Sequence, residues 1–142
     1  MSSKVRSALV QSLVDLSTAN SWTYPIAAEN NPEEQNHDSV WLGISYIPNI
    51  PDVATLGDGG EDDLNGIFQI DIFTPLGKGE KDALDIVDVL RSYFTAGRRF
   101  AYSGQEVVIT GCGQTNGFSS NNYFRIPVSV IWYSRLTRTI NT

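Results

Sequence analysis

The sequence predicts an α+β fold in which an antiparallel sheet of four to five strands carries two helices packed on one face. Three observations support this prediction: two segments with apolar residues at helical spacing, two alternating strands joined by a loop alone, and a strand–turn–strand pattern before a last alternating strand. Strands without a crossover helix between them are antiparallel neighbours. The expected order is α-β-β-α-β-β, within one domain of residues 1–142.

The first helix is expected over residues 4–18. One side of it carries the residues that recur at 3.6 per turn, namely Val5, Ala8, Leu9, Ser12, Leu13 and Leu16. Val10 and Val14 lie on the flank of this stripe. They either widen the buried face or form a second strip that contacts a partner. Residues 20–38 follow as a polar connection with one short extended piece at 22–26.

The first two strands are expected over residues 39–48 and 66–74. Their inward faces would carry Val40, Leu42, Ile44 and Tyr46 in one strand, and Phe68, Ile70 and Ile72 in the other. The second face of the sheet would carry Trp41, Ile67, Phe73, Ile131 and Tyr133. That face is more apolar than solvent requires, so we expect another subunit to cover it.

The second helix is expected over residues 79–95, with Gly97 as a left-handed cap. A strand–turn–strand around Ser103 and Gly104 follows, and then a long strand in which apolar residues alternate up to residue 136. Pro127 has no backbone N–H, so the strand lacks one hydrogen-bond donor at that position. We therefore expect the strand to lie at an edge of the sheet or to bulge there.

Charge is distributed unevenly along the chain. Residues 1–96 hold five Lys and Arg against 15 Asp and Glu, whereas residues 97–142 hold five Arg and only Glu106 as an acid. The acidic part argues against general nucleic-acid binding, which needs a basic footprint. Either the acidic surface of one copy meets the basic surface of another, or the two parts neutralise each other within one subunit.

Composition excludes several further classes. One cysteine, Cys112, cannot form an intramolecular disulfide. The first residues lack a secretory signal, and no stretch approaches the ~20 apolar residues of a membrane span. We therefore expect a soluble protein that is made in a cytoplasm and has no membrane partner.

An acidic, glycine-rich loop at residues 48–66 is expected to separate the first two strands. It holds Asp58, Glu61, Asp62 and Asp63 but does not match the EF-hand pattern. Three interpretations remain open: a weak Mg²⁺ or Ca²⁺ site at Asp58, Asp62 and Asp63, a solvated loop, or a segment that orders against a partner.

No catalytic pattern stands out. His37 is the only histidine and lies in a polar segment, so neither a catalytic triad nor a zinc site can be built. The glycines of residues 111–117 lack dinucleotide-binding spacing, and residues 77–82 lack the Walker spacing. We expect no enzymatic activity and no cofactor.

The whole pattern resembles the tail terminator, or tail-completion, proteins of long-tailed bacteriophages, including the lambda-type terminator. The segments that carry the resemblance are "VWLGISYIP", "GIFQIDIFTPLGKGEKDALDIVDVLRSYF", "GRRF", "QEVVIT" and "YFRIPVSVIWYSR", within residues 3–136. The resemblance implies a ring, usually a hexamer, that caps the tail-tube protein, stops tail growth and meets the head connector of the neck. It implies a location in the virion after assembly in the host cytoplasm. It also implies that Mg²⁺ can promote assembly.

Two patches are expected to build such a ring, because a ring needs a heterologous interface. The candidate interface residues are Val10, Val14, Trp41, Arg98, Arg99, Arg125, Tyr133 and Arg135, and the candidate loop contacts are Asp58, Glu61, Asp62 and Asp63. The alternatives are a head-completion or connector-adaptor protein of the phage neck, and a small metal- or ligand-binding α+β module.

Overall fold

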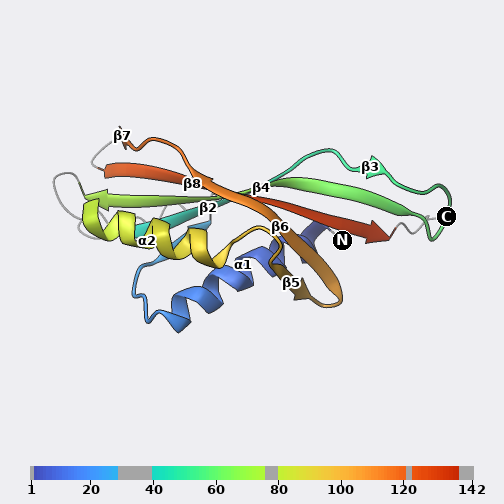
Figure 1. The fold of residues 1–142 in the computed structure, drawn as a ribbon, viewed down its shortest axis with the longest axis horizontal. Helices are drawn as coiled ribbons and strands as arrows, with labels where there is room; N and C mark the ends of the chain where they lie inside the picture. The colour runs from blue at the N-terminus through green and yellow to red at the C-terminus, as the bar shows by residue number, and fades with distance from the viewer. Residues whose placement is uncertain (1, 29–39, 76–79, 121–122, 138–142) are drawn as a thin grey trace.

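A computed structural model describes residues 2–28, 40–75, 80–120 and 123–137, and the structural statements below refer to these ranges. The elements are α1 (Ser2–Ala19), β1 (Ile26–Ala28), β2 (Trp41–Pro48), β3 (Asp52–Val53), β4 (Glu61–Pro75), α2 (Glu80–Tyr93), β5 (Arg99–Tyr102), β6 (Gln105–Gln114), β7 (Phe118–Ser120) and β8 (Tyr123–Thr137). Both helices lie on the same side of the sheet, and the sheet continues past them at one end (Figure 1).

The sheet is larger than predicted, and it is mixed. Eight described strands join it in the order β1-β2-β4-β8-β6-β5, with β3 also paired to β4 and β7 to β8. β1 runs parallel to β2, and the other pairs are antiparallel. The prediction of an antiparallel sheet with four to five strands in the order α-β-β-α-β-β is therefore wrong. The short strands β1, β3 and β7, of two or three residues, account for much of the difference, because so short a segment shows no alternation.

β4 and β8 form the centre of the sheet. They pair continuously from Glu61 opposite Thr137 to Pro75 opposite Tyr123. β4 thus begins at Glu61, so residues 61–65, which the sequence assigned wholly to a loop, are strand. Their carboxylates mask the strand signal, but pairing with the end of β8 extends β4 through them.

Pro127 lies in this central strand, so the prediction of an edge strand or a bulge at Pro127 is wrong. Its carbonyl accepts a hydrogen bond from the Thr115 N–H at 3.1 Å. In an antiparallel pair the N–H and C=O of one residue point the same way, so the missing donor of Pro127 faces the connection 115–117 between β6 and β7. The irregularity lies instead in β6, where the register shifts between Ile109 and Gly111.

The core lies between the two helices and the facing side of the sheet. The helix residues of this core are Val5, Ala8, Leu9, Leu13 and Leu16 of α1, as the helical spacing predicts, together with Ala83, Ile86, Val87 and Leu90 of α2. On the sheet side Phe68 and Trp132 are fully buried, and Tyr46 stacks on Trp132 with ring centroids 5.5 Å apart. Burying such side chains supplies about 1.5–3 kcal/mol each, which is the main driving force for this layer packing.

The opposite side of the sheet, its outer face, carries polar residues, a small buried cluster of Ala27, Trp41 and Tyr123 with Phe73 beside it, and one exposed apolar row across its middle. Ile47, Ile67 and Ile131 lie directly opposite one another on β2, β4 and β8, and all three are exposed. This row is the part of the predicted apolar second face that reaches solvent in the subunit.

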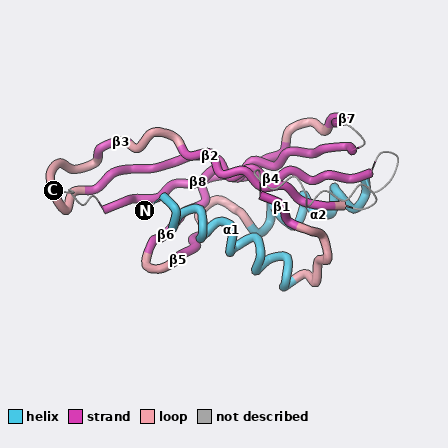
Figure 2. The backbone as a smooth tube through the Cα atoms, turned by 180° about the vertical axis from the view of Figure 1, so that it is seen from behind, coloured by secondary structure: helices cyan, strands magenta, loops and turns pink. Residues whose placement is uncertain are grey.

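One end of the sheet extends past the helices as a projection that is visible from both sides (Figures 1 and 2). β3, the first residues of β4 and the end of β8 build it. We call residues 49–64 the acidic arm. It contains Asp52, Asp58, Glu61, Asp62 and Asp63 but no Lys, Arg or His.

Candidate functional site

The tip of the acidic arm is a closed turn. The N–H groups of Ala54 and Thr55 donate to the Glu61 carbonyl at 2.9 and 3.0 Å, and the Glu61 N–H donates to Thr55 Oγ1 at 2.7 Å. Gly57 and Gly59 adopt φ values of 91° and 77°, which glycine adopts without a steric penalty. The arm therefore keeps a defined shape through local bonds while it buries few of its own side chains.

Three aliphatic side chains of the acidic arm reach solvent. Ile50 is 89% exposed, Leu56 is 87% exposed and Val53 is 61% exposed. Isolated exposed aliphatic residues are ordinary, but three within one short segment form an apolar surface that a protein partner can bury. Sequence reasoning missed these three residues, because it judged the segment by its glycines and carboxylates and not by its isolated aliphatic residues.

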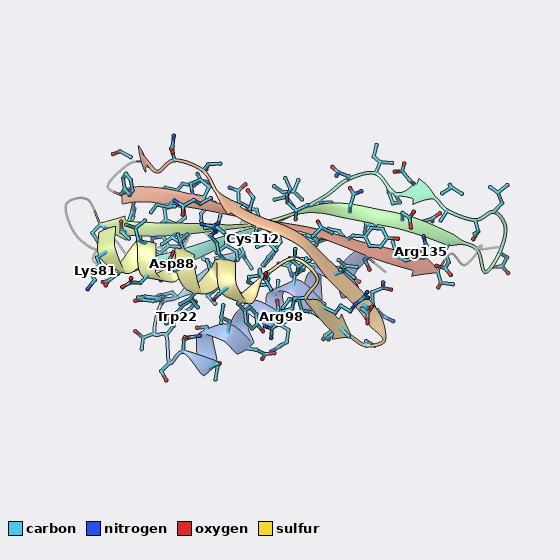
Figure 3. The ribbon with its side chains drawn as sticks, viewed as in Figure 1. Trp22, Lys81, Asp88, Arg98, Cys112 and Arg135 are labelled. Atoms are coloured by element: carbon cyan, nitrogen blue, oxygen red, sulfur yellow. The ribbon has the colours of Figure 1, made fainter. Side chains whose placement is uncertain are left out.

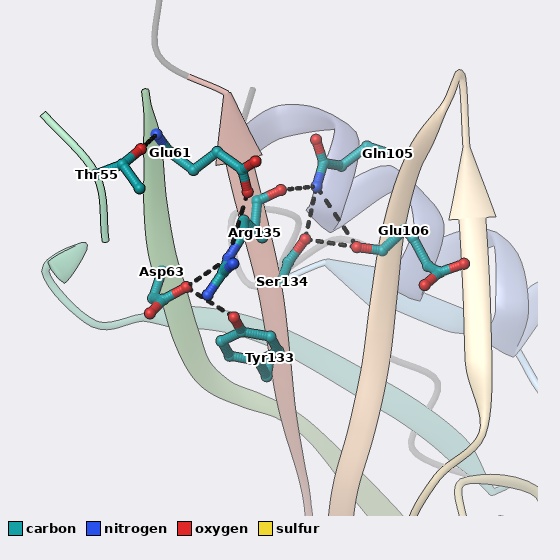
Figure 4. Close-up of polar contacts among 8 residues, drawn as sticks. All are labelled: Thr55, Glu61, Asp63, Gln105, Glu106, Tyr133, Ser134 and Arg135. Atoms are coloured by element: carbon teal, nitrogen blue, oxygen red, sulfur yellow. Dashed lines mark hydrogen bonds and ion pairs between the residues drawn. The ribbon is translucent and has the colours of Figure 1, made fainter. Parts of the chain in front are cut away.

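The base of the acidic arm is joined to β8 by a polar cluster around Arg135 (Figure 4). Arg135 Nε lies 3.0 Å from Asp63 Oδ1 and 3.4 Å from Glu61 Oε2. The Tyr133 hydroxyl donates to the same Asp63 oxygen at 2.7 Å. This hydrogen bond, followed by the one from Arg135, lowers the pKa of Asp63, and it raises the pKa of Tyr133.

A second set of hydrogen bonds continues from this cluster toward β6 (Figure 4). Gln105 Nε2 donates to Ser134 Oγ at 2.7 Å and to the Arg135 carbonyl at 2.9 Å. The Ser134 hydroxyl, which is buried, donates to the Glu106 carbonyl at 2.5 Å. These bonds join three neighbouring strands, β4, β8 and β6, although each contact is of modest strength.

The carboxylates of the arm do not gather into a metal site. Within the described residues, which include Asp58, Asp62 and Asp63, no group of three or more His, Cys, Asp or Glu side chains could hold a metal ion. Asp63 instead faces Arg135 and Tyr133. A Mg²⁺ or Ca²⁺ ion held by these carboxylates within one subunit therefore does not fit the arrangement.

Arg98 lies near the end of α2 and away from Arg135 (Figure 3), although both were predicted as interface residues. Arg99 begins β5 and lines the same surface pocket as Arg135. The guanidinium carbon of Arg98 lies 4.3 Å from the centroid of the Tyr93 ring, an arrangement that stabilises the cation by the ring quadrupole. Arg99 pairs with Glu106 on the adjacent strand, and both side chains are largely exposed. Exposed pairs of this kind contribute about 0–1 kcal/mol.

Arg125 lies on the outer face of the sheet beside an ion partner that sequence reasoning missed. Its Nη2 is 2.6 Å from Asp71 Oδ2, and the Asp71 carboxylate also accepts from Gln69 Nε2 at 2.9 Å. Asp71 alternates with apolar residues in β4, which is the pattern of an exposed position, yet it is only 4% exposed. Together with Arg135, Arg125 neutralises acids of the first part of the chain within one subunit.

The three apolar interface candidates differ in accessibility. Val14 is exposed, and Val10 is partly buried against the core. Trp41 is buried: it stacks on Phe73 with ring centroids 4.0 Å apart and meets Tyr123 edge-on. Trp41 therefore serves the packing of the subunit, and a partner reaches Val14 more readily.

The other motifs offer no assembled chemistry in the described parts. Cys112 is half-buried in β6, and burial raises the pKa of its thiol, which keeps the nucleophilic thiolate scarce. His37 and the loop 77–79 fall outside the described residues. None of the described helices has the length and apolar character required to cross a bilayer.

A comparison with protein families decides the identity. The model of a family described as phage tail terminator protein matches residues 4–132, which is most of the chain. The chain belongs to the phage tail terminator family. The family consists of structural proteins of the phage tail, and the resemblance noted in the sequence is thereby confirmed.

The fold of this terminator-family chain recurs among solved structures. One of them matches with a TM-score of 0.75 over 100% of this chain and 99% of the other, at 19% sequence identity. At that identity the likeness establishes the fold alone. No match was found among curated proteins.

Proposed function

We propose that this chain forms a ring, with six copies as the expected number, that caps the phage tail tube, ends tail growth and joins the tail to the head connector. The family match over residues 4–132 carries this proposal. Its partners would be other copies of itself, the tail-tube protein and a connector protein of the neck. Its work would consist of binding, with no bond made or broken.

The described surface is suited to such a role. It offers separate patches on different sides of the subunit: the acidic arm, the isoleucine row of Ile47, Ile67 and Ile131, and the exposed flank of α1 at Val14. A ring requires two unlike patches that meet between neighbours, and further surface for the tube and the connector. Of the accessible candidate interface residues, Val14 lies on one of these patches and Arg135 contacts the acidic arm.

The test uses tails from the phage that encodes the chain, prepared without this protein. Tubes formed without it should vary in length, and adding the purified protein should place a ring on one tube end in negative-stain images. Rings on the tubes support the proposal. A protein that leaves tubes bare but binds the portal face of isolated heads would be a head-completion or connector-adaptor protein instead.

Mg²⁺ enters as a promoter of assembly and not as a resident cofactor. Five carboxylates on one arm repel the carboxylates of any neighbouring arm, so a divalent cation between copies would favour ring closure. This role needs no metal cage within one subunit. Calorimetry on monomeric protein separates it from a metal-binding module, which would bind Mg²⁺ or Ca²⁺ before any assembly.

A further inference from the structure

We propose that the acidic arm of one copy docks on the outer flank of α1 of the next copy, a contact that rests on the proposed ring. The donor surface is the exposed aliphatic set of Ile50, Val53 and Leu56 with the carboxylates beside it. The receiving surface is the flank of α1 on which Val10 and Val14 share a face with Arg6.

The arm carries a concentrated negative charge. Asp52 lies directly opposite Asp63 across β3 and β4, and Val53 lies opposite Asp62. Like charges placed opposite each other in a sheet destabilise it. Arg135 approaches Asp63 and Glu61 from β8. A cationic surface on a partner would be attracted to this concentration of carboxylates.

The first half of α1 carries the complementary charge. Lys4 and Arg6 are exposed near its amino end, and the first acid of the helix is Asp15. The helix has no acidic residue in its first turn, where the helix dipole favours one. Cations at this end are unfavourable for the helix itself, which is consistent with a role in contacting another molecule.

The apolar parts of the two surfaces also match. Arg6, Val10 and Val14 recur every four residues, so they share one face of α1 at the edge of the buried stripe. Val10 is partly buried against the core there. Val14 is 40% exposed on this face. The exposed aliphatic side chains of the arm would pack against this face of α1 and bury its apolar area.

Among the described residues, the complementary charge of the arm and of α1 is not used in a contact within one subunit. The arm projects past the helices (Figure 1), and in the described part of the chain no ion pair joins Lys4 or Arg6 to the arm. The two surfaces lie on different parts of the subunit, so each copy uses one of them toward each neighbour. Such a heterologous contact closes into a ring when the rotation allows it.

Two variants and their mixture test the contact. The arm variant carries Ile50→Ser and Leu56→Ser, the helix variant carries Arg6→Glu and Val14→Ser, and Leu84→Ser on α2 is a control of similar exposure. Sedimentation velocity across concentration should show self-association at least about tenfold weaker for either variant, with the control unchanged. Far-UV circular dichroism and thermal melts check that each variant folds.

Mixing provides the sharper outcome. Each variant keeps one intact surface, so an equal mixture should form one-to-one dimers that neither variant forms alone. If both variants form rings as the wild-type protein does, or if their mixture stays monomeric, the arm contact is wrong. The proposed ring itself is not contradicted by either result. A wild-type protein that never assembles at any concentration would overturn the ring and this contact together.

Discussion

The carboxylate of Asp71 and the guanidinium of Arg125 lie 2.6 Å apart on the outer face of the sheet, and Asp71 is almost completely enclosed. Removing the arginine leaves a buried charge without its main partner, so Arg125→Ala should destabilise the subunit by roughly 2–4 kcal/mol. This lies below the cost for a fully enclosed pair because the arginine is partly exposed. Urea denaturation measures it. An unchanged midpoint would mean that Asp71 is solvated or held by other donors, and Arg99→Ala, in an exposed pair, is the control.

Gly66 tests how closely β2 and β4 approach. A Cβ at this position would lie 2.4 Å from the Ile47 carbonyl oxygen and 2.9 Å from Trp132 Cζ2. Gly66→Ala should therefore cost about 1–3 kcal/mol through displaced backbone and core. Gly113→Ala is the matched control, since no atom of the described residues lies within 4 Å of a Cβ there. Equal melting temperatures for the two variants would contradict the close approach.

The Asp63 and Tyr133 pair predicts a pH response at the base of the arm. The pKa of Asp63 is lowered from 3.8, so its contribution to stability is present above that value and is lost as the pH falls through the lowered pKa. The pKa of Tyr133 is raised from 10.0, so its contribution is lost as the pH rises through the raised value. NMR titration of the Asp63 carboxyl checks this, and Tyr133→Phe should shift its midpoint upward. If Tyr133→Phe leaves the midpoint unchanged, the hydrogen bond from Tyr133 is not the cause of the lowered pKa of Asp63.

Charge reversal near the end of α2 tests whether that region contacts a neighbour. Arg98→Glu should weaken self-association more than folding, with a strong dependence on salt, because interfacial charges are screened by ions. Arg99→Glu should act less, because Arg99 already pairs with Glu106 in its own subunit. Analytical ultracentrifugation at two salt concentrations measures both effects. Identical oligomer sizes for both reversals and wild type would exclude this region from the interface.

Mg²⁺ should increase the ring fraction at a fixed protein concentration, and EDTA should reverse the increase. NaCl of equal ionic strength is the control, because screening alone also reduces repulsion between carboxylates. A combined Asp58→Asn, Asp62→Asn variant should lose the specific part of the response. If NaCl reproduces the whole effect, Mg²⁺ acts only as an electrolyte.

Long elements were predictable from the sequence. Apolar residues at 3.6-residue spacing predicted both helices and their buried stripes, and strict alternation predicted the inward faces of β4 and β8. β5 was predictable from the turn at Ser103 and Gly104, whereas β1, β3 and β7 were not, since they exist only because a longer strand pairs with them. These short strands are stabilised by hydrogen bonds to a longer neighbouring strand, and the local sequence does not show that pairing.

The candidate site was less predictable for the same reason. Alternation placed Trp41 and Phe73 on the same face of the sheet but could not show that their rings stack, or that Arg125 pairs with Asp71. The arm carboxylates were recognised as a group, whereas the exposure of Ile50 and Leu56 follows only from the projection of the arm beyond the helices. Contacts of this kind join residues that are far apart in the sequence, so local patterns do not predict them.

The position of β8 has a consequence for how the protein is made. β8 lies at the centre of the sheet yet follows every other described strand in the sequence. During synthesis β4 and β6 therefore emerge from the ribosome without the strand that joins them, and their apolar faces must wait for it. Long-range pairing of this kind slows folding and leaves the nascent chain vulnerable to aggregation until its final strand inserts.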